Sequence, residues 1–460
     1  MEYYLFITYC FIAILALVQA VLGGLQTWEH RRFARSRFRK LHDCRPRGKA
    51  MIFAPCKGVD LDLERNLQRL YEQDYEEYEI TFIVQSRSDP ACELVEKVMA
   101  ENHHIRSHLV IAGKADASGE DKISGQKVHN LRVATQNLSA DIDYLVFVDS
   151  DAQPRPEWLR ALVGRLGLRK RNDMGASTGY RWMMPGRATL ANYLLYSINC
   201  SVTTLLGSRS CYPVWGGSWA LRRETFESID LRGQWAGTLS DDLVATRVLT
   251  EQKRPVRFEP ACLVASPVDN NFRDTFSFLR RQYLIARFYV PAWWTLGMAT
   301  ITVANLIWPA SFAAIGFGLW TGSTLFSSAW LWLPAAVLTT FYGLGVYRGW
   351  LRQSLIKLYF PLLQEKLRGA RLFDIWAGPL SALAHWAALI AASYGRTITW
   401  RNITYRLYRG GRVETVSARP LELKAFHGIE EVEDDLATEP HIIEPLVADA
   451  EKRSGTQRAA

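Results

Sequence analysis

The sequence predicts an α/β domain with a mainly parallel sheet and helices on both faces, accompanied by apolar helices near both ends of the chain. Over residues 50–265, short apolar runs alternate with amphipathic stretches, as strands and crossover helices do. Strongly apolar blocks lie at the start of the chain and again after residue 290, although the mean hydropathy of the whole chain is only −0.07. The chain is therefore expected to be a membrane protein with a large extramembrane domain.

Length and composition narrow the classes of protein. The 460 residues, 48% of them hydrophobic, are enough for two or three domains with a full core. The 7 cysteines are widely separated and include no C-x-x-C pair. This excludes a disulfide framework or a zinc ribbon and suits a reducing compartment.

The first apolar block runs from Tyr3 to Leu25, long enough to span a bilayer as a helix. No Lys or Arg precedes it and no good cleavage site follows it, so we expect an uncleaved anchor over residues 1–26 rather than a signal peptide. The following segment, 27–49, is rich in Lys and Arg. Basic residues beside a span stay on the cytoplasmic side and contact lipid headgroups, so no nucleic-acid partner is expected.

Apolar blocks return in the C-terminal membrane region that we expect over residues 289–395. They are Leu296–Trp320, Leu325–Val346 and Ile375–Ala392. A basic stretch at 348–373 lies between the last two blocks, and within it Leu351–Leu363 has the pattern of an amphipathic interfacial helix. Gly378-Pro379 leaves open whether the last block spans or re-enters. The tail at 396–460 is first basic and then acidic, and its end is expected to be disordered.

The middle of the chain supplies the elements of the α/β domain. The predicted strands are Met51–Ala54, Tyr78–Gln85, His108–Ala112 and Tyr144–Val148, and the predicted helices between them include Leu61–Gln73 and Cys92–Asn102. Ligands of such sheets bind at the carboxyl ends of the strands, so the polar residues that follow the strands matter most. The sequence has no G-x-G-x-x-G and no P-loop motif, which disfavours nicotinamide and ATP chemistry.

Two carboxylates, Asp149 and Asp151, follow the last of these strands. At a strand end they can reach the same side of a turn and hold a Mg²⁺ or Mn²⁺ ion that bridges the phosphates of a nucleotide. An ordinary Asp-Ser-Asp turn is the alternative explanation. We favour the metal site because the motif directly follows a buried strand.

Asp89, which follows a predicted strand, and Lys127, in a loop before a helix, are two further candidates. Asp89 is suited to accept a hydrogen bond from a base or ribose, and equally suited to cap the helix that begins near Pro90. Lys127 opens a helix, where a cation opposes the helix dipole; a phosphate partner would explain it, and a solvated lysine is the alternative.

Further along, Asp241 and Asp242 open an amphipathic helix, and helix capping accounts readily for one acid at this place. The second could act as a general base toward an acceptor hydroxyl. Between the two acidic motifs stands Val214-Trp215-Gly216-Gly217-Ser218-Trp219. Gly217 permits close backbone approach, and Trp215 or Trp219 offers a flat wall for a sugar or lipid; a glycine turn with tryptophans in the core is the alternative.

The order of these motifs resembles that of ceramide glucosyltransferases, the family 21 relatives of the family 2 glycosyltransferases. The resemblance begins with Ala54-Pro55-Cys56-Lys57-Gly58-Val59-Asp60 and passes through Asp89-Pro90-Ala91, Lys127-Val128-His129-Asn130-Leu131, Asp149-Ser150-Asp151, Gly216-Gly217-Ser218 and Asp241-Asp242. It ends after the apolar blocks with Trp400-Arg401-Asn402-Ile403-Thr404-Tyr405. It thus covers nearly the whole chain.

The resemblance implies a GT-A fold over residues 50–288, on the cytoplasmic side, that transfers a sugar from a UDP-sugar to the hydroxyl of a membrane lipid with inversion. It assigns Asp89 to the uridine, Asp149 and Asp151 to the metal and diphosphate, and Asp242 to the role of base. We add Lys127 and Arg281 to the UDP-sugar site and Asp241, Trp215, Gly217 and Trp219 to the pocket for sugar and acceptor.

One departure from the family concerns its closing motif, (Gln or Arg)-x-x-Arg-Trp, which here reads Arg281-Gln282-Tyr283-Leu284-Ile285. Arg280 or Arg287 could supply the lost cation, or simply lie at the membrane surface. The departure leaves the sugar and acceptor open. Two alternatives remain. One is a processive polysaccharide synthase, which the small number of expected spans and the lost motif disfavour. The other is a non-catalytic nucleotide- or lipid-binding membrane protein on a decayed scaffold, which Leu284-Ile285 favours and the retained acidic motifs disfavour. A bacterial host would imply the plasma membrane, and a eukaryotic host the Golgi or endoplasmic reticulum; the oligomeric state stays open.

Overall fold

A computed structural model describes residues 2–41, 43–60, 62–115, 123–167, 174–209, 212–321, 325–401, 403–418 and 441–443. The chain divides into two compact units. Unit 1 comprises Met1–Ser36, Trp182–Ser208 and Val268–Gly395, and unit 2 comprises Arg37–Arg181, Arg209–Pro267 and Arg396–Ala460.

Unit 2 is built on an 8-stranded sheet in the order β11-β3-β2-β1-β4-β6-β5-β7. The strands are β1 (Lys49–Pro55), β2 (Tyr78–Val84), β3 (Ser107–Ile111), β4 (Ile142–Val148), β5 (Ala176–Pro185), β6 (Ser218–Arg222), β7 (Val256–Val268) and β11 (His441–Ile443). Neighbouring strands among β1–β4 pair in parallel, whereas β6 is antiparallel to both β4 and β5. Strands β1–β5 therefore share one direction, which confirms the mainly parallel sheet.

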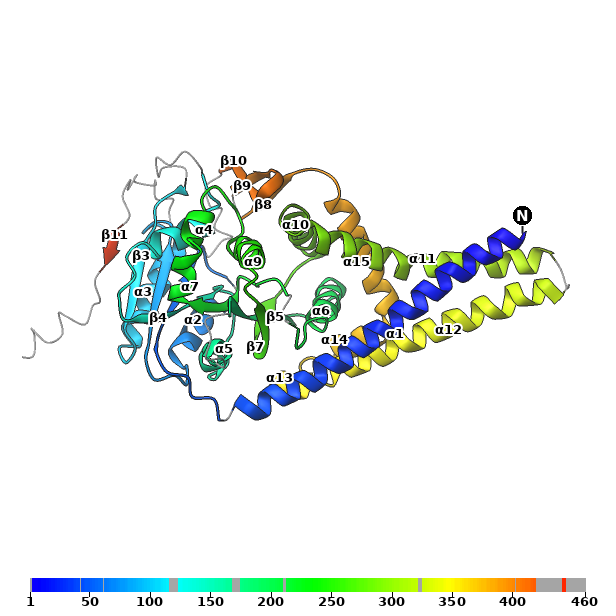
Figure 1. Cartoon of the computed structure of the whole chain (residues 1–460), viewed down its shortest axis with the longest axis horizontal. Coiled ribbons are helices and arrows are strands. Elements are labelled where there is room, and N and C mark those ends of the chain that lie inside the picture. Colours follow the sequence, from blue (N-terminus) through cyan, green and yellow to red (C-terminus); the bar gives the residue numbers. More distant parts are fainter. Residues whose placement is uncertain are drawn as a thin grey trace, which may run out of the picture. The chain divides into compact units, whose positions relative to one another are not determined.

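Helices cover both faces of this sheet, as predicted (Figure 1). They are α2 (Leu63–Tyr71), α3 (Pro90–Glu101), α4 (Gln126–Ala134), α5 (Trp158–Gly167), α7 (Arg223–Ser228), α8 (Leu231–Gln234) and α9 (Asp241–Glu251). The central strands are buried on both faces, because alternate residues of each strand face opposite layers of helices.

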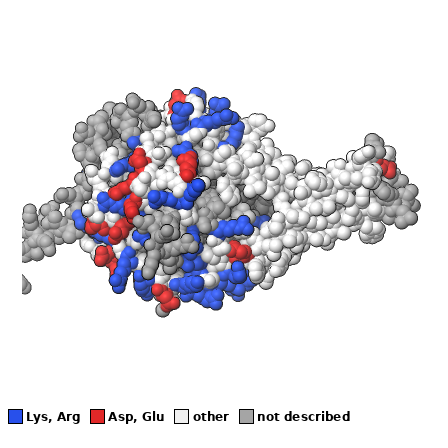
Figure 2. All heavy atoms as spheres, viewed as in Figure 1, with Lys and Arg blue, Asp and Glu red and all other residues white. Residues whose placement is uncertain are grey.

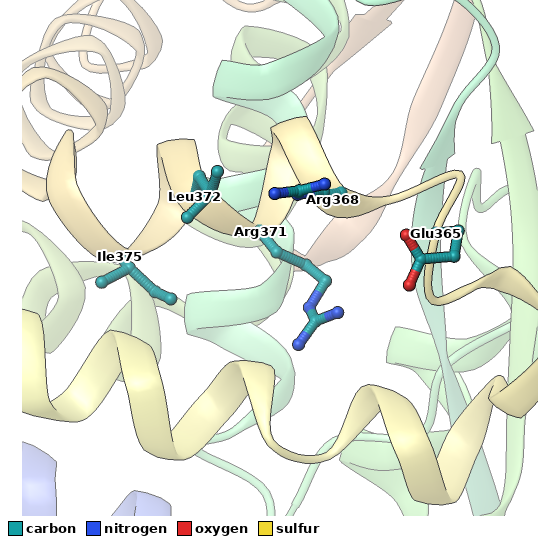
Figure 3. Close-up of a pocket in the computed structure, with 5 residues that line it drawn as sticks. All are labelled: Glu365, Arg368, Arg371, Leu372 and Ile375. Atoms are coloured by element: carbon teal, nitrogen blue, oxygen red, sulfur yellow. The ribbon is translucent and has the colours of Figure 1, made fainter.

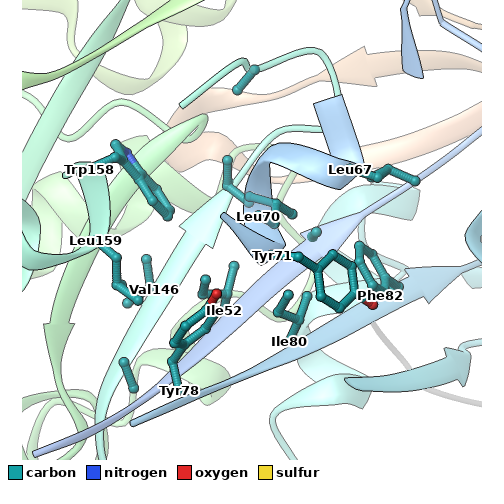
Figure 4. Close-up of a cluster of buried hydrophobic side chains, with 14 of the residues drawn as sticks. Ile52, Leu67, Leu70, Tyr71, Tyr78, Ile80, Phe82, Val146, Trp158 and Leu159 are labelled. Atoms are coloured by element: carbon teal, nitrogen blue, oxygen red, sulfur yellow. The ribbon is translucent and has the colours of Figure 1, made fainter. Parts of the chain in front are cut away.

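On one face, Ile52 and Val146 pack with Leu67, Leu70 and the fully buried Trp158 in a continuous hydrophobic cluster (Figure 4). On the other face the core is aromatic. Phe147 stacks on Phe53 and on Trp219, with ring centroids 5.4 and 4.4 Å apart, and it meets Trp235 edge to face. Burial of these two sets of side chains from water holds the helices against both faces of the sheet.

A second, three-stranded antiparallel sheet belongs to the same unit: β8 (Thr397–Trp400), β9 (Ile403–Leu407) and β10 (Val413–Ala418). It was not predicted, because this part of the tail was assigned only by its charge. The backbone N–H of Val413 donates to the carbonyl of Gly237, and the backbone N–H of Gln126 donates to Tyr405 Oη, 3.1 Å away. The sheet is thus bonded to the loop before α9 and to the start of α4.

Unit 1 contains the apolar helices. Those long and apolar enough to cross a membrane are α1 (Glu2–Leu41), α11 (Pro291–Thr321) and α12 (Leu325–Gln353). A bent pair, α14 (Arg368–Trp376) and α15 (Gly378–Ala392), passes the same test only as a pair, with an angle of 83° at the break. The other helices of the unit are α6 (Leu190–Thr203), α10 (Phe272–Tyr289), α13 (Ile356–Tyr359) and the 3₁₀ turn η2 (Pro361–Leu363).

The three long helices pack along one another (Figure 1). Tyr9 and Ala13 of α1 meet Ile307 of α11 and Trp330 of α12 in one buried cluster. Their outward surface is apolar, with Phe312 60% and Trp332 76% exposed. Figure 2 shows that this surface carries almost no charged side chains, as a lipid-facing surface requires.

The expected amphipathic helix over Leu351–Leu363 does not form as one piece. The segment is divided among the end of α12, the short α13 and the turn η2, which begins at Pro361. Proline has no N–H to continue a helix, and Leu351, Leu355 and Ile356 are buried in the unit rather than presented to a membrane surface. The amphipathic helix of this region is α14 instead.

A buried polar network joins α6, α12 and α14 within unit 1. The Arg352 guanidinium donates to both oxygens of Asp374 at 2.8 and 2.7 Å, and the Ser197 hydroxyl and Gln353 amide donate to the same carboxylate. Tyr196 Oη donates to Gln353 Oε1. Because the buried carboxylate is fully bonded, the network gives these helices a specific register instead of leaving an unpaired charge.

Candidate active site

Lys127 is the centre of a charge cluster in unit 2. Its Nζ lies 2.7 Å from Asp149 Oδ1 and 3.1 Å from Asp241 Oδ1. Burial alone lowers the pKa of this ammonium, but the nearby carboxylates Asp149, Asp241 and Asp242 raise the pKa above its ordinary value. Lys127 is therefore not the solvated lysine that was the alternative explanation. It is a permanent cation surrounded by carboxylates, in the first turn of α4.

Asp242 is held rigidly at the start of α9. Its Oδ2 accepts from the backbone N–H of Gly216 at 2.8 Å, and its Oδ1 accepts from the backbone N–H of Leu243 at 2.8 Å and from the Ser240 hydroxyl. Ser240 is the N-cap of α9, and its hydroxyl also accepts from the N–H of Leu243. Ser240 and Asp242 thus share the capping of α9, which leaves Asp241 to be explained otherwise.

Asp241 differs from its neighbour in burial and bonding. Its side chain is 3% exposed, and its Oδ2 is buried without a hydrogen-bond partner among the described residues. Burial, opposed by Lys127 and reinforced by the charge of Asp242, raises the pKa of Asp241 to about 7. A carboxyl group with a pKa near 7 can exchange a proton near neutral pH.

The Asp149-Ser150-Asp151 motif lies at the carboxyl end of β4. Asp149 is paired with Lys127, while Asp151 has a buried Oδ1 that lacks a hydrogen-bond partner in the part of the chain described. Burial, followed by the charge of Asp149, raises the pKa of Asp151 to about 6. A buried carboxylate oxygen without a partner beside a second carboxylate is the arrangement that a cation would stabilise.

This arrangement fits a divalent metal in part. Among the described residues, no group of three or more His, Cys, Asp or Glu is placed to hold a metal ion by itself. Mg²⁺ and Mn²⁺ accept one or two protein carboxylates when phosphate oxygens and water complete the shell. Asp149 and Asp151 would supply the protein ligands of such a site.

The glycine turn before β6 joins the two acidic motifs. A Cβ at Gly216 would lie 3.0 Å from Lys127 Nζ and 3.1 Å from Asp242 Oδ2. A Cβ at Gly217 would lie 2.4 Å from two ring carbons of Trp215 and 2.7 Å from Asp149 Oδ2. Only glycine allows the backbone this close to the charged groups.

The two tryptophans beside the turn have different places. Trp215 is partly exposed, next to Gly217, with the Arg181 guanidinium 5.5 Å from its ring centroid. Trp219 is fully buried and stacks on Phe147 in the core, as the alternative explanation held. Of the two, Trp215 is the one available to a ligand.

Asp89 caps α3, with Oδ1 accepting from the N–H of Ala91 at 3.0 Å, and the same oxygen accepts from the N–H of Gly58 at 2.7 Å. This ties the loop after β1 to the loop after β2. A structural role for Asp89 is thus present, and its contact with uridine stays a prediction.

Arg281 belongs to α10 in unit 1, where its guanidinium lies over the ring of Phe278. Arg280 and Arg287, the candidates for the lost cation, donate to backbone carbonyls at the end of α15, among them Ala391 and Ala392. They therefore cap that helix. Leu284, in the place of the family arginine, is completely buried in this unit.

Two charged residues near Asp151, and an arginine paired with one of them, were not singled out as site residues from the sequence. Asp60 and Arg181 both act electrostatically on Asp151, Asp60 raising its pKa and Arg181 lowering it. Arg401, at the tip of the β8–β9 hairpin, donates to both oxygens of Asp60 at 2.6 and 2.7 Å. Ser150 Oγ also donates to Asp60. The only sequence signal was that Asp60 and Arg401 lie inside family-like motifs.

The chain belongs to glycosyl transferase family 21, whose family model matches residues 11–413. This confirms the resemblance seen in the order of the motifs.

The matches to individual proteins cover less of the chain or are less similar in sequence than the match to the family model. A ceramide glucosyltransferase of Komagataella phaffii is 32% identical over 81 residues, which is 17% of this chain and 15% of that protein. A solved mannosyltransferase of Pyrobaculum calidifontis, in complex with GDP-Man and Mn²⁺, is 17% identical with a TM-score of 0.43, over 80% of this chain and 99% of the other. A Mycobacterium tuberculosis glucosyl-3-phosphoglycerate synthase with Mn²⁺ and UDP-glucose has a TM-score of 0.32 at 13% identity, over 53% and 80% of the two chains.

Proposed function

We propose that this glycosyltransferase moves a sugar, glucose in the first instance, from a UDP-sugar to the hydroxyl of a membrane lipid of the ceramide type, with inversion at the anomeric carbon. Family 21 membership and the partial match to a ceramide glucosyltransferase support the substrates. The observation that carries the proposal is the cluster in which Lys127 is paired with Asp149 and Asp241, beside the fixed carboxylate of Asp242.

Each group has a role in the proposal. Lys127 neutralises the diphosphate, which would take the place of a carboxylate beside its ammonium group. A divalent ion held by Asp149 and Asp151 would supply further positive charge to the leaving group. Trp215 forms the wall of the sugar pocket, and Gly217 allows the donor to approach the backbone.

Asp242 acts as the general base. It accepts the proton of the lipid hydroxyl, the hydroxyl oxygen forms the new bond to the anomeric carbon, and the bond to UDP breaks with its electron pair leaving on the diphosphate. The hydrogen bonds from Gly216 and Leu243 hold the carboxylate in one orientation for this step.

Asp241 is a second candidate for the base, favoured by a specific observation. Its Oδ2 has no hydrogen-bond partner among the described residues and its pKa is raised to about 7, so it can take and return a proton near neutral pH. In our assignment it lines the acceptor pocket, and the exchange of each acid for its amide separates the two roles.

The proposal includes a membrane topology with the catalytic unit on the cytoplasmic side. The hairpin that follows the last apolar block belongs to unit 2, together with the α/β fold. Residues 267 and 396 then lie on the same side of the membrane, so the chain between them must cross it an even number of times. Two crossings by α11 and α12 meet this condition if α14 and α15 form a re-entrant pair, and the basic start of the tail then lies inside with the other basic segments.

The test is UDP release by the detergent-purified chain with Mn²⁺ or Mg²⁺, several UDP-sugars, and ceramide or diacylglycerol. Asp242→Asn should reduce lipid-dependent release by about 100-fold or more while UDP binding persists, because general-base catalysis contributes about 10²–10⁴-fold. Asp62→Asn, at an exposed residue, is the matched control. Full activity in Asp242→Asn with loss in Asp241→Asn would move the base to Asp241, and no release with any acceptor would contradict the proposed reaction. The anomeric configuration of the product tests inversion.

A further inference from the structure

A cavity of about 290 Å³ lies beside α14 in unit 1 (Figure 3). Its lining consists of Glu365, Arg368, Arg371, Leu372 and Ile375. Figure 3 shows the two arginines in the middle, with Glu365 on one side of them and Leu372 and Ile375 on the other. The cavity thus joins a cationic part to an apolar part.

The two arginines are short of partners. Arg368 has no side-chain hydrogen bond or ion pair with the described residues. Arg371 donates from Nη1 to the carbonyl of Gln364 at a long 3.5 Å, and its buried Nε has no partner in the described part of the chain. Glu365 forms no ion pair with either arginine, since neither lies within salt-bridge distance. Two guanidinium groups therefore face the cavity with most of their donors unused, and such groups bind phosphate with paired hydrogen bonds.

The surroundings of the cavity indicate which phosphate it takes. Leu362 is 95% exposed, Leu372 50% and Trp376 57%, so α14 and the turn before it present large apolar side chains beside the arginines. Apolar side chains and basic groups on one short helix are typical of a segment that lies in the membrane interface, where tryptophan is enriched. A soluble anion would need no such apolar neighbours.

We propose that Arg368 and Arg371 bind the phosphate of an anionic phospholipid, with its glycerol and upper acyl chain against Leu372 and Ile375. The volume is near the lower end of ligand pockets, about 300–1,000 Å³, and so accommodates a headgroup rather than a whole lipid. The site is separate from the carboxylate cluster of unit 2 and does not depend on the proposed reaction.

Native mass spectrometry of the delipidated full chain tests this site with phosphatidylglycerol and phosphatidylcholine as probes. Arg368→Gln/Arg371→Gln should lower the apparent affinity for phosphatidylglycerol by about tenfold or more, since two charge-assisted contacts are lost. Lys357→Gln/Lys366→Gln removes the same charge from exposed residues of the neighbouring segment outside the cavity, and should bind as the wild type does.

The remaining outcomes overturn the proposal. Equal losses in the two double variants would mean diffuse attraction to a basic surface. Equal binding of phosphatidylcholine and phosphatidylglycerol by the wild type would remove the anionic specificity. Displacement of the lipid by inorganic phosphate at matching concentration would make this a site for soluble phosphate. If the double variant does not elute as a folded protein, Arg368→Gln alone decides the question, because Arg368 is exposed and its side chain has no partner in the described part of the chain. Unchanged binding in this variant would refute the site.

Discussion

Replacement of Lys127 by methionine tests the charge cluster without any assay of activity. The change keeps an unbranched apolar chain up to the ε position and removes the ammonium that lies between Asp149 and Asp241. Removing one partner of a buried ion pair costs about 3–5 kcal/mol, because the other charge stays buried. Asp149 is 28% exposed and keeps some hydration, so we expect the lower end of this range, about 3 kcal/mol, at a pH where the buried Asp241 is ionised.

The size of the loss should depend on pH. With Lys127 present, the pKa of Asp241 is raised to about 7, and without the ammonium it must rise further. Below about pH 7 the carboxyl is protonated in both proteins, so the difference in their free energies of unfolding is constant. Above pH 7 the native variant holds a proton that the native wild type has released. The variant then loses stability relative to the wild type by about 1.4 kcal/mol per pH unit until its own pKa is passed.

Thermal unfolding in detergent at two pH values, on either side of 7, measures this difference. A loss of about 3 kcal/mol should lower the Tm by roughly 6–12 °C for a domain of this size. Lys97→Met, which removes a lysine from an exposed pair with Glu64, should leave the Tm unchanged. Adding Asp241→Asn to Lys127→Met should recover part of the loss. An unchanged Tm in Lys127→Met, a gap that does not widen with pH, or no recovery in the double variant would refute the buried-charge argument.

Two further changes test the glycine turn and the core of unit 1. Gly217→Ala should lower UDP release by about 100-fold, because its Cβ would lie 2.4 Å from the Trp215 ring and force it to shift, whereas Gly167→Ala, with no atom within 4 Å of its Cβ, should retain full activity. Near-normal release by Gly217→Ala would mean that the turn does not shape the site. Asp374→Asn leaves the Arg352 guanidinium buried without its carboxylate and should cost about 3–5 kcal/mol, seen as a lower Tm in detergent; an unshifted Tm would contradict the network.

Local patterns were enough to predict the parallel strands and the helices that are long and apolar enough to cross a membrane. The predicted strand Tyr144–Val148 is an unbroken apolar run within β4, and such a run can be buried only inside a sheet covered on both faces. The long apolar helices α1, α11 and α12 follow from length and composition in the same way. Asp149, Lys127 and Asp242 could be named because each stands where a strand or helix begins or ends, and topology brings those ends together.

Other features were decided only by the tertiary structure, because they depend on contacts between segments that are distant in the chain. The pairing of Arg401 with Asp60 joins residues 341 positions apart, and no local pattern encodes such a contact. The same holds for the burial of Trp219 against Phe147, since a tryptophan beside a glycine turn is equally compatible with a ligand wall and with the core. Sequence periodicity shows which side of a helix or strand is apolar. Packing decides which element covers that side, and therefore which charged groups lie next to each buried carboxylate.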